Sequence, residues 1–280
     1  MNDMRLGICT IQRDRGRWLK EWVAFHYAVG VRKFYIFLHR CTDDSESVVR
    51  GLQKHFDIRC FTLSEDVVRP QLAAYQYAYQ HHGHELDWMA FIDGDEFLFP
   101  SQADDLQAVL HRYHYEKLSA LGVWWVCYGS NGHVKEPDGL IIQNYLHRPQ
   151  LSHLNNRHFK CLVRGRLGNA FSIQQNAHLF KTPDGTVDEN MRPLSVGYMP
   201  DTEPTYDFLR INHYVCQSYE YFKTFKQHSG MADAGAQAVR SEEMWHRDDC
   251  NDVHDDAALR FLPSVERILS SIASEHDPAV

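Results

Sequence analysis

The stretch Trp88-Met-Ala-Phe-Ile-Asp93-Gly-Asp95-Glu96-Phe-Leu-Phe-Pro100 decides the fold of this 280-residue chain. An apolar run of the length of a buried strand ends at three carboxylates, and a second apolar run follows them. Asp93 and Asp95 are two residues apart, so in an extended backbone both side chains point to the same side. Gly94 has no Cβ and lets another group approach the main chain closely. The pattern predicts a strand edge that presents two carboxylates on one face.

Two carboxylates on one face suit a divalent cation, because they are hard oxygen ligands and the ion keeps positions open for phosphate oxygens. No Lys or Arg stands near Asp93 and Asp95 in the sequence to offset their charge. The alternative is an acidic residue that caps a turn, which is commoner for a single Asp. We therefore predict a divalent-cation site at Asp93 and Asp95.

Strands and helices alternate in the residues that precede this stretch. The expected strands are residues 6–11, 34–38, 59–63 and 88–92, and the expected helices are residues 17–29, 48–56 and 71–79. The alternation predicts an α/β fold with a mainly parallel central sheet that helices cover on both faces. Ligands bind such sheets at the carboxyl ends of the strands, which is where Asp93 stands.

The second half of the chain has α+β character. Its expected helices are residues 106–115, 219–226 and 264–272, and its expected strands are residues 123–128, 140–145, 159–163 and 208–211. Residues 241–256 are strongly charged and are expected to form an exposed loop. We predict one principal domain over residues 1–230, with a C-terminal loop and helical extension over residues 231–280 packed on it.

The composition excludes several classes of protein. Hydrophobic residues make up 44% of the chain and charged residues 24%, which is typical of a folded protein. The formal net charge of −8 repels a phosphate backbone, so nucleic acid is not an expected partner. No stretch approaches the roughly 18 apolar residues that span a bilayer, and the N-terminus lacks an apolar signal region. We expect a cytoplasmic protein, or one peripheral to the inner face of the membrane, with no transmembrane segment.

Several short motifs follow one another over residues 6–230. In chain order they are Trp18-Leu-Lys-Glu21-Trp22-Val-Ala-Phe-His26, Phe34-Tyr-Ile-Phe37, Thr42-Asp-Asp-Ser45, Gln71 with its helix, Phe91-Ile-Asp93-Gly-Asp95-Glu96-Phe97, Tyr128-Gly-Ser-Asn131-Gly132-His133, Lys160-Cys-Leu-Val-Arg164 and Ile211-Asn-His213-Tyr214. The ordered set resembles glycosyltransferase family 92 and the related family-2-like bacterial glycosyltransferases. The resemblance implies a GT-A fold, which is a Rossmann-like nucleotide-sugar-binding domain, with a Mn²⁺ or Mg²⁺ ion and inversion at the anomeric carbon.

The resemblance also suggests roles for individual residues. The candidates are Thr10, Arg13, Gln71, Asp93 and Lys160 for the nucleotide-sugar donor, Asn131, Gly132 and His133 for the acceptor, and Asp93, Asp95 and His213 for the metal. His178 is the alternative to His213. Inversion by direct displacement also requires a general base on the acceptor hydroxyl. Asp201 and Glu203 are the candidates by position, and Asp184, Asp188 and Glu189 stay open as alternatives.

Two segments depart from the family pattern. Residues 38–40 are Leu-His-Arg where the family has an Asp-Asn pair, and Gln12-Arg13-Asp14 replaces Lys-Asn-Glu. The leading hypothesis is a metal-dependent inverting glycosyltransferase of the hexosyltransferase type, acting in polysaccharide biosynthesis. Its donor is expected to be a UDP-sugar and its acceptor a glycan or glycoconjugate. The alternatives are a sugar-phosphate nucleotidyltransferase, which usually has a Gly-rich loop after the first strand, and an inactive carbohydrate-binding scaffold.

Overall fold

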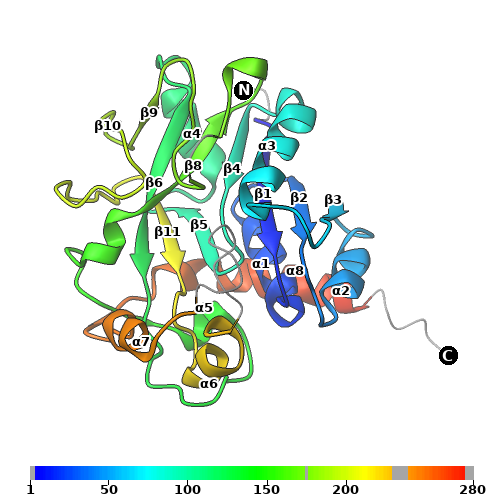
Figure 1. Ribbon diagram of the computed structural model, residues 1–280, viewed down its shortest axis with the longest axis vertical. Coiled ribbons are helices and arrows are strands. Elements are labelled where there is room, and N and C mark those ends of the chain that lie inside the picture. Colours follow the sequence, from blue (N-terminus) through cyan, green and yellow to red (C-terminus); the bar gives the residue numbers. More distant parts are fainter. Residues whose placement is uncertain (1–3, 174–175, 229–238, 275–280) are drawn as a thin grey trace.

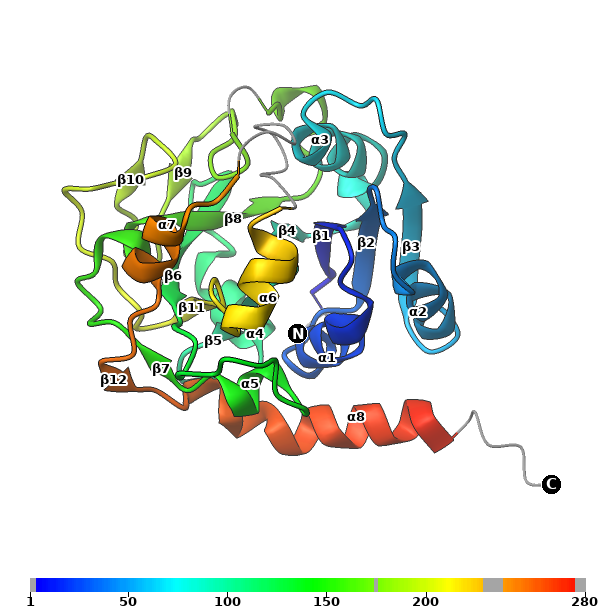
Figure 2. The ribbon, with the colours of Figure 1, turned by 60° about the horizontal axis from the view of Figure 1, so that its bottom comes forward.

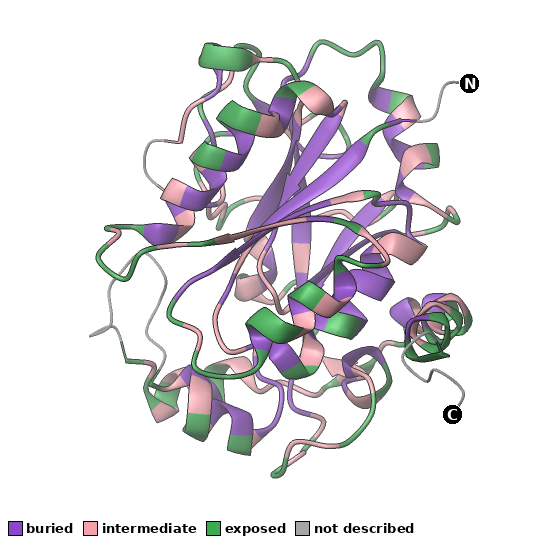
Figure 3. Cartoon of the chain, turned by 90° about the vertical axis from the view of Figure 1, so that its right-hand side faces the viewer, coloured by how far each residue is buried: buried purple, intermediate pink, exposed green. Residues whose placement is uncertain are grey.

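Hydrogen-bonded strands run through the molecule in the order β10-β9-β6-β8-β4-β1-β2-β3 (Figure 1). The computed structural model describes residues 4–173, 176–228 and 239–274. Buried strands form the centre, and helices lie around them with their exposed sides outward (Figure 3). The fold is therefore α/β, as the alternation of sequence patterns predicts.

The first half of the chain supplies the parallel part of the sheet. Its strands are β1 (Leu6–Gln12), β2 (Lys33–Leu38), β3 (Asp57–Thr62) and β4 (Trp88–Phe91), and its helices are α1 (Gly16–Ala28), α2 (Ser45–Leu52) and α3 (Pro70–His82). β1 pairs in parallel with both β2 and β4, and β2 pairs in parallel with β3. Every strand and helix expected in this half is confirmed, with small shifts at the ends.

The second half adds shorter elements and mixes strand directions. Its strands are β5 (Glu96–Pro100), β6 (Ala120–Cys127), β7 (His147–Arg148), β8 (Phe159–Arg164), β9 (Thr186–Val187), β10 (Pro193–Leu194), β11 (Leu209–His213) and β12 (Val253–His254). Its helices are α4 (Leu106–Leu110), α5 (Ile141–Asn144), α6 (Tyr219–Tyr221), α7 (Glu242–Asp248) and α8 (Leu262–Ser274), and a π-helical turn, Phe222–Lys226, continues α6. β8 is antiparallel to β4 and to β6, whereas β11 is parallel to β6 and antiparallel to β5.

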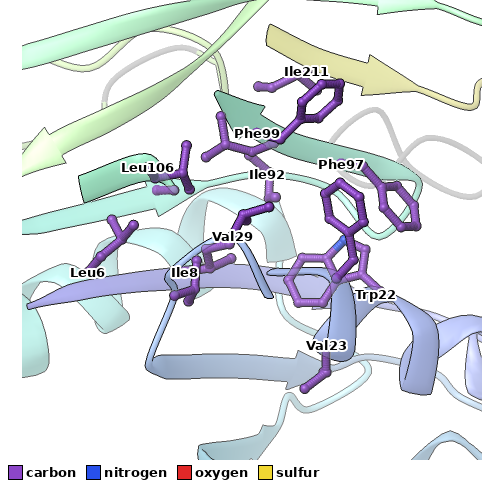
Figure 4. Packing of buried hydrophobic residues seen from close by; sticks show 14 of the residues in the cluster. Leu6, Ile8, Trp22, Val23, Val29, Ile92, Phe97, Phe99, Leu106 and Ile211 are labelled. Atoms are coloured by element: carbon purple, nitrogen blue, oxygen red, sulfur yellow. The ribbon is translucent and has the colours of Figure 1, made fainter. Parts of the chain in front are cut away.

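Two apolar layers cover the two faces of the sheet, because successive residues of a strand point to opposite faces. In β4, Trp88 and Ala90 join the larger layer with α1, α2 and α8, while Met89 and Phe91 join the layer under α3. Figure 4 shows part of the larger layer, where Trp22 lies beside Phe97. The indole N–H of Trp22 donates to the carbonyl of Glu96 at 2.9 Å, so this core holds the acidic stretch directly.

The helix α1 also provides a hydrogen-bond acceptor for the edge of β5 that does not pair with β11. The Nδ1 atom of His26 lies 2.8 Å from the carbonyl of Trp22, and the backbone N–H of Leu98 donates to Nε2 of His26 at 3.1 Å. A carbonyl can only accept, so Nδ1 carries the ring proton and Nε2 is the acceptor. Burial lowers the pKa of His26 to about 3, so the ring is neutral near physiological pH.

The helix α8 (Leu262–Ser274) packs on the larger apolar layer. Val265 and Ile272 of α8 are buried in that layer, and α8 runs alongside α1 (Figure 2). The ring of Phe261 contacts those of Phe25 and Phe99 edge to face at centroid distances of 5.6 and 5.7 Å. The division between residues 230 and 231 lies outside the described residues and stays a prediction.

The predicted strand over residues 140–145 is wrong, because residues 141–144 form the short helix α5. The carboxylate of Glu21, on α1, accepts the backbone N–H groups of Ile141 at 2.7 Å and Ile142 at 3.0 Å. These are the unsatisfied donors of a helix start. A distant side chain therefore fixes the segment as a helix, which overrides its apolar, strand-like composition.

The predicted exposed loop over residues 241–256 is also wrong in part, because the segment contains α7. The Ser241 side chain accepts the backbone N–H of Met244 at 3.3 Å, and two glutamates stand in the first turn. Both features favour a helix start. Trp245 is buried against Phe222 at a centroid distance of 5.0 Å, so one apolar face anchors this charged helix.

Replacing Phe261 with alanine tests whether the extension and the main layer unfold together. We expect Phe261→Ala to lower the free energy of unfolding by about 3–5 kcal/mol, because it opens a cavity between α1 and β5. The control Tyr115→Ala removes a ring that is 95% exposed and should change the free energy of unfolding by less than about 0.5 kcal/mol. Urea unfolding followed by circular dichroism and by tryptophan fluorescence should give one shared transition. Two separate transitions would show that the extension is an independent unit.

Candidate active site

The Asp93-Gly94-Asp95 turn connects β4 to β5 at the carboxyl edge of the parallel strands, where the end of β1 lies against it. A Cβ atom at Gly94 would stand 2.0 Å from Oε1 of Gln12, so only glycine fits this approach without moving Gln12. The guanidinium of Arg15 donates to the carbonyl of Gly94 at 3.0 Å. The loop after β1 thus fixes the backbone of the acidic turn.

Three side chains from two elements hold the carboxylate of Asp93. Oδ2 accepts from Nζ of Lys160, on β8, at 2.9 Å. Oδ1 accepts from the hydroxyl of Tyr75 at 3.2 Å and from the side-chain amide of Gln71, both on α3. Burial raises the pKa of Asp93, but the ammonium of Lys160 outweighs this effect and the pKa is lowered. Asp93 is therefore a fixed anion.

Glu96 is the third carboxylate of the stretch and is fully buried. Its Oε2 accepts the backbone N–H of Asp93 at 2.9 Å, and its Oε1 lies 3.9 Å from Nζ of Lys160. Burial raises the pKa of Glu96 well above its usual range, and the Lys160 ammonium offsets only part of this effect. One buried ammonium thus stands beside two carboxyl groups, and Glu96 is the one that more readily keeps a proton.

Asp95 faces the second half of the chain. Its Oδ2 accepts from Nζ of Lys226 at 2.6 Å, and Nε2 of His213 lies 3.6 Å from its Oδ1. The backbone N–H of Tyr214 donates to the Asp95 carbonyl at 2.9 Å. Burial raises the pKa of Asp95, but Lys226 and His213 outweigh this effect and hold the pKa well below its usual range.

Lys160 and Lys226 offset the charge of the two aspartates, which the sequence alone does not predict. Asp93 and Asp95 lack a basic neighbour along the chain, but the fold brings Lys160 to one and Lys226 to the other. Lys160 is 1% exposed, and its ammonium donates to Asp93. Its direct contact with a diphosphate stays a prediction.

Arg15 links the acidic turn to α6, although the sequence gives it no distinguishing motif. Its Nη1 donates to the side chains of Gln217 and Tyr221, each at 2.6 Å, while its Nη2 bonds Gly94. The guanidinium also lies 4.5 Å from the ring centroid of Trp18. The buried arginine therefore fixes α6 over this edge of the sheet, where Figure 2 shows it between α1 and β11.

Three histidines surround the indole of Trp125, on β6. The ring centroid of Trp125 lies 4.3 Å from that of His213, 5.0 Å from that of His158 and 5.2 Å from that of His178. Nδ1 of His178 lies 2.8 Å from the carbonyl of Phe159. Burial, followed by the charge of Lys160, lowers the pKa of His178 to about 3, so this ring is neutral.

Asp95 and His213 are the residues that best fit a divalent cation. A carboxylate oxygen and an imidazole nitrogen are both Mn²⁺ ligands, and Nε2 of His213 faces Oδ1 of Asp95 at 3.6 Å. Both oxygens of Asp93 are already engaged by Lys160, Gln71 and Tyr75. Its role as a metal ligand stays a prediction.

In the described residues, only one group of three His, Cys, Asp or Glu side chains has all its ligand atoms within 4.8 Å of one another, and it does not include Asp93, Asp95 or His213. It consists of Asp14, Cys41 and Asp43, beside the start of α1. Its carboxylates accept backbone N–H groups, among them that of Gly16 at 2.8 Å and that of Ser45 at 2.9 Å, which explains their proximity structurally. Asp93, Asp95 and His213 do not form such a closed trio.

The first-strand candidates lie beside the acidic turn. Thr10 is fully buried, and its hydroxyl accepts from the side chain of Gln12 at 2.8 Å, so it reaches the turn through Gln12. The side chain of Arg13 is 36% exposed and lies 4.0 Å from the carboxylate of Asp14. Their contact with a donor stays a prediction.

The expected acceptor loop has a clear structural role. Asn131 and Gly132 have positive φ values of 55° and 74°, which form a tight turn. Oδ1 of Asn131 accepts the backbone N–H groups of Leu146 at 3.1 Å and His147 at 2.8 Å. Nε2 of His133 lies 3.1 Å from the carbonyl of Asn144. These contacts organise residues 130–147, and the acceptor role stays a prediction.

The alternatives for the general base are held in structural contacts. Asp188 is fully buried and pairs with Arg192 at 2.6 Å. Glu189 accepts the backbone N–H groups of residues 207–209 at 2.8–2.9 Å. Asp184 bonds Ser119 at 3.0 Å.

The two preferred base candidates lie on the loop before β11. Asp201 is exposed, and the carboxylate of Glu203 pairs with Arg157 at 2.5 Å. No contact found in the described residues joins either side chain to the acidic turn. Their catalytic role stays a prediction.

A mixed α/β sheet with an Asp-Gly-Asp turn at the carboxyl ends of its parallel strands is the architecture of the GT-A class. The chain belongs to glycosyltransferase family 92, whose profile matches residues 4–242. It is 26% identical over 218 residues to a family 92 protein of Oryza sativa subsp. japonica and 29% identical over 221 residues to one of Ricinus communis. Each match covers 77% of this chain but only 34% and 36%, respectively, of the plant protein.

Solved structures with partial likeness include two bacterial proteins. Staphylococcus aureus TarS 1-349 aligns with a TM-score of 0.40 and 11% identity, over 98% of this chain and 74% of that one. Glucosyl-3-phosphoglycerate synthase from Mycobacterium tuberculosis aligns with a TM-score of 0.32 and 16% identity, over 44% of this chain and 43% of that one. Among the helices of the described residues, none has the length and apolar character needed to cross a membrane.

Replacing Lys160 with methionine should expose the repulsion between Asp93 and Glu96. We expect Lys160→Met to lower the free energy of unfolding at pH 8 by about 3–5 kcal/mol, because it leaves buried charge uncompensated. The deficit should shrink as the pH falls to 5, since protonation then neutralises carboxyl groups that Lys160 no longer balances. In the wild type, the pKa of Asp93 is lower in the folded protein than its ordinary value of 3.8. The stability that ionised Asp93 contributes is therefore lost only as the pH falls below 3.8.

The control for this experiment is Lys117→Met, which removes an ammonium from a side chain that is 91% exposed. It should change the free energy of unfolding by less than about 0.5 kcal/mol. Chemical unfolding at several pH values measures both variants. A Lys160→Met deficit that is small, or independent of pH, would contradict the assigned charge balance.

Proposed function

We propose that the protein is a metal-dependent inverting glycosyltransferase that moves a sugar from a UDP-sugar to a glycan or glycoconjugate acceptor. The observation that carries the proposal is the facing pair of Asp95 and His213 beside the fixed anion Asp93. Membership of glycosyltransferase family 92 supports the reaction class. The donor, the metal and the stereochemical outcome are parts of this proposal.

Sugar transfer leaves negative charge on the departing diphosphate, and a bound divalent cation stabilises that charge. Asp95 and His213 are the residues proposed to hold the cation. Asp93 is oriented by Lys160, Gln71 and Tyr75, so its carboxylate is fixed before a donor arrives. Such preorganisation avoids a rearrangement cost during the reaction.

Inversion requires a base that takes the proton of the attacking hydroxyl. We propose Asp201 for this role, because the carboxylate of Glu203 is already paired with Arg157.

The loop of Asp201 is attached to the strand region of the site. The N–H of Met199 donates to the Arg157 carbonyl at 3.0 Å, and Tyr198 forms a β-bridge with His158. His158 in turn stacks on Trp125. This attachment supports an acceptor position on the side of Trp125.

Binding of UDP should depend on a divalent cation. By calorimetry, we expect wild-type protein to bind UDP at least about tenfold more tightly in Mn²⁺ than in EDTA, because Asp95 would hold a cation that offsets the charge of the diphosphate. Asp95→Asn should remove most of this difference. The control Asp138→Asn changes a fully exposed carboxylate and should leave it intact. Equal UDP affinity in Mn²⁺ and in EDTA would contradict the metal dependence and leave Lys160 and Lys226 as the cations of the site.

Mn²⁺ titration distinguishes His213 from His178, two of the three histidines around Trp125. We expect His213→Ala to weaken Mn²⁺ binding about tenfold or more, because it removes a nitrogen ligand beside Asp95. His178→Ala should leave Mn²⁺ affinity within about twofold, since its Nδ1 bonds the Phe159 carbonyl and no described contact joins the ring to Asp95. Electron paramagnetic resonance of free Mn²⁺ measures the Mn²⁺ affinities of both variants. The opposite order would assign the ligand to His178.

A further inference from the structure

Lys226 occupies the position of a cation on Asp95. Its Nζ donates to Oδ2 of Asp95 at 2.6 Å and to the carbonyl of Val215 at 2.5 Å. The whole residue is only 7% exposed. The lysine is the last residue of the π-helical turn Phe222–Lys226, and no sequence motif marks it. It is thus a buried, specific counter-ion supplied by the second half of the chain.

A divalent cation on Asp95 and this ammonium would repel each other. Metal–oxygen distances are about 2.1 Å, so a metal on Oδ1 would lie roughly 4–5 Å from the ammonium on Oδ2 of the same carboxylate. A dication and an ammonium at that separation in a mostly buried site repel strongly. Lys226 and the metal therefore compete for one carboxylate.

Lys226 lies beside a small pocket and on a π-helical turn, whereas Lys160 lies on a central strand. A pocket borders Lys226, and its other lining residues are Val215, Cys216, Phe222, Arg240, Met244, Trp245 and Asp248. π-Helical turns are rare and often occur at functional sites, and lysine carries its charge on a flexible four-carbon stem. Lys160 instead projects from the central strand β8 and is 1% exposed.

We propose that Lys226 is the resident counter-ion of Asp95, that a divalent cation displaces it, and that the displaced ammonium binds the diphosphate of the nucleotide donor. This inference rests on the proposed function. In the absence of metal, the lysine keeps Asp95 neutralised in its buried position. With Asp95 holding a cation, the ammonium of Lys226 would contact the diphosphate instead, since lysine binds phosphate well as a point charge.

The proposal predicts opposite effects of one substitution on two ligands. In nucleotide-free protein, Lys226→Met should bind Mn²⁺ about tenfold more tightly than the wild type, because the competing charge is gone. At saturating Mn²⁺, the same variant should bind UDP about tenfold more weakly, because a phosphate contact is lost. A variant that merely damaged the site would weaken both.

The matched control is Lys223→Met, on the same turn, whose ammonium pairs with Glu242 away from Asp95. It should leave both affinities unchanged. Calorimetry gives the two dissociation constants, and thermal melting checks that each variant is folded. Lys226→Gln, which keeps a polar side chain without the charge, serves if Lys226→Met does not fold.

The outcomes separate this proposal from the function on which it rests. Equal Mn²⁺ affinity in the wild type and Lys226→Met overturns the counter-ion role, and unchanged UDP affinity overturns the diphosphate contact, while the metal-dependent function stands. If neither protein binds Mn²⁺, the proposed metal dependence itself is wrong, and the counter-ion proposal falls with it. If Lys226→Met binds Mn²⁺ tightly and the wild type does not bind it, the proposal is supported in its strongest form.

Discussion

The ion pair between the buried Lys160 and Asp93 is the constraint on which the rest of the site depends. Three carboxyl groups within four residues at the end of a core strand would repel one another and lose their hydration. The ammonium of Lys160, 2.9 Å from Asp93 and 3.9 Å from Glu96, compensates this repulsion from the neighbouring strand β8. Because β8 runs antiparallel to β4, the start of one strand meets the end of the other. Strand direction thus places the cation where it is needed.

The site is also the joint between the two halves of the chain. The parallel half contributes the acidic turn, and the mixed half contributes Lys160, His213 and Lys226. Arg15 adds a second connection, since its guanidinium bonds both Gly94 and the side chains of Gln217 and Tyr221. The charges that would act on a ligand therefore also hold the chain together, so the site and the fold cannot vary independently.

The sequence predicts those features that depend on neighbours along the chain. Apolar runs of strand length and helical periodicity locate β1 to β4 and α1 to α3, and the abrupt end of β4 in acidic residues locates the carboxyl edge. The short helix α5 escapes prediction because its start is fixed by Glu21, 120 residues away. Lys226, 131 residues from Asp95, escapes for the same reason, since nothing near it in the sequence distinguishes it from an exposed lysine. Long-range polar contacts leave no local pattern.

The neutral ring of His26 has a consequence for how this molecule meets other copies of itself. An exposed strand edge offers unpaired N–H groups on which a foreign strand can assemble. In β5, the outward N–H of Leu98 is already taken by Nε2 of His26, and a pKa of about 3 keeps that acceptor available at physiological pH. A strand from another molecule finds no donor there. The same helix that anchors the acidic stretch therefore protects this edge of the sheet against intermolecular strand addition.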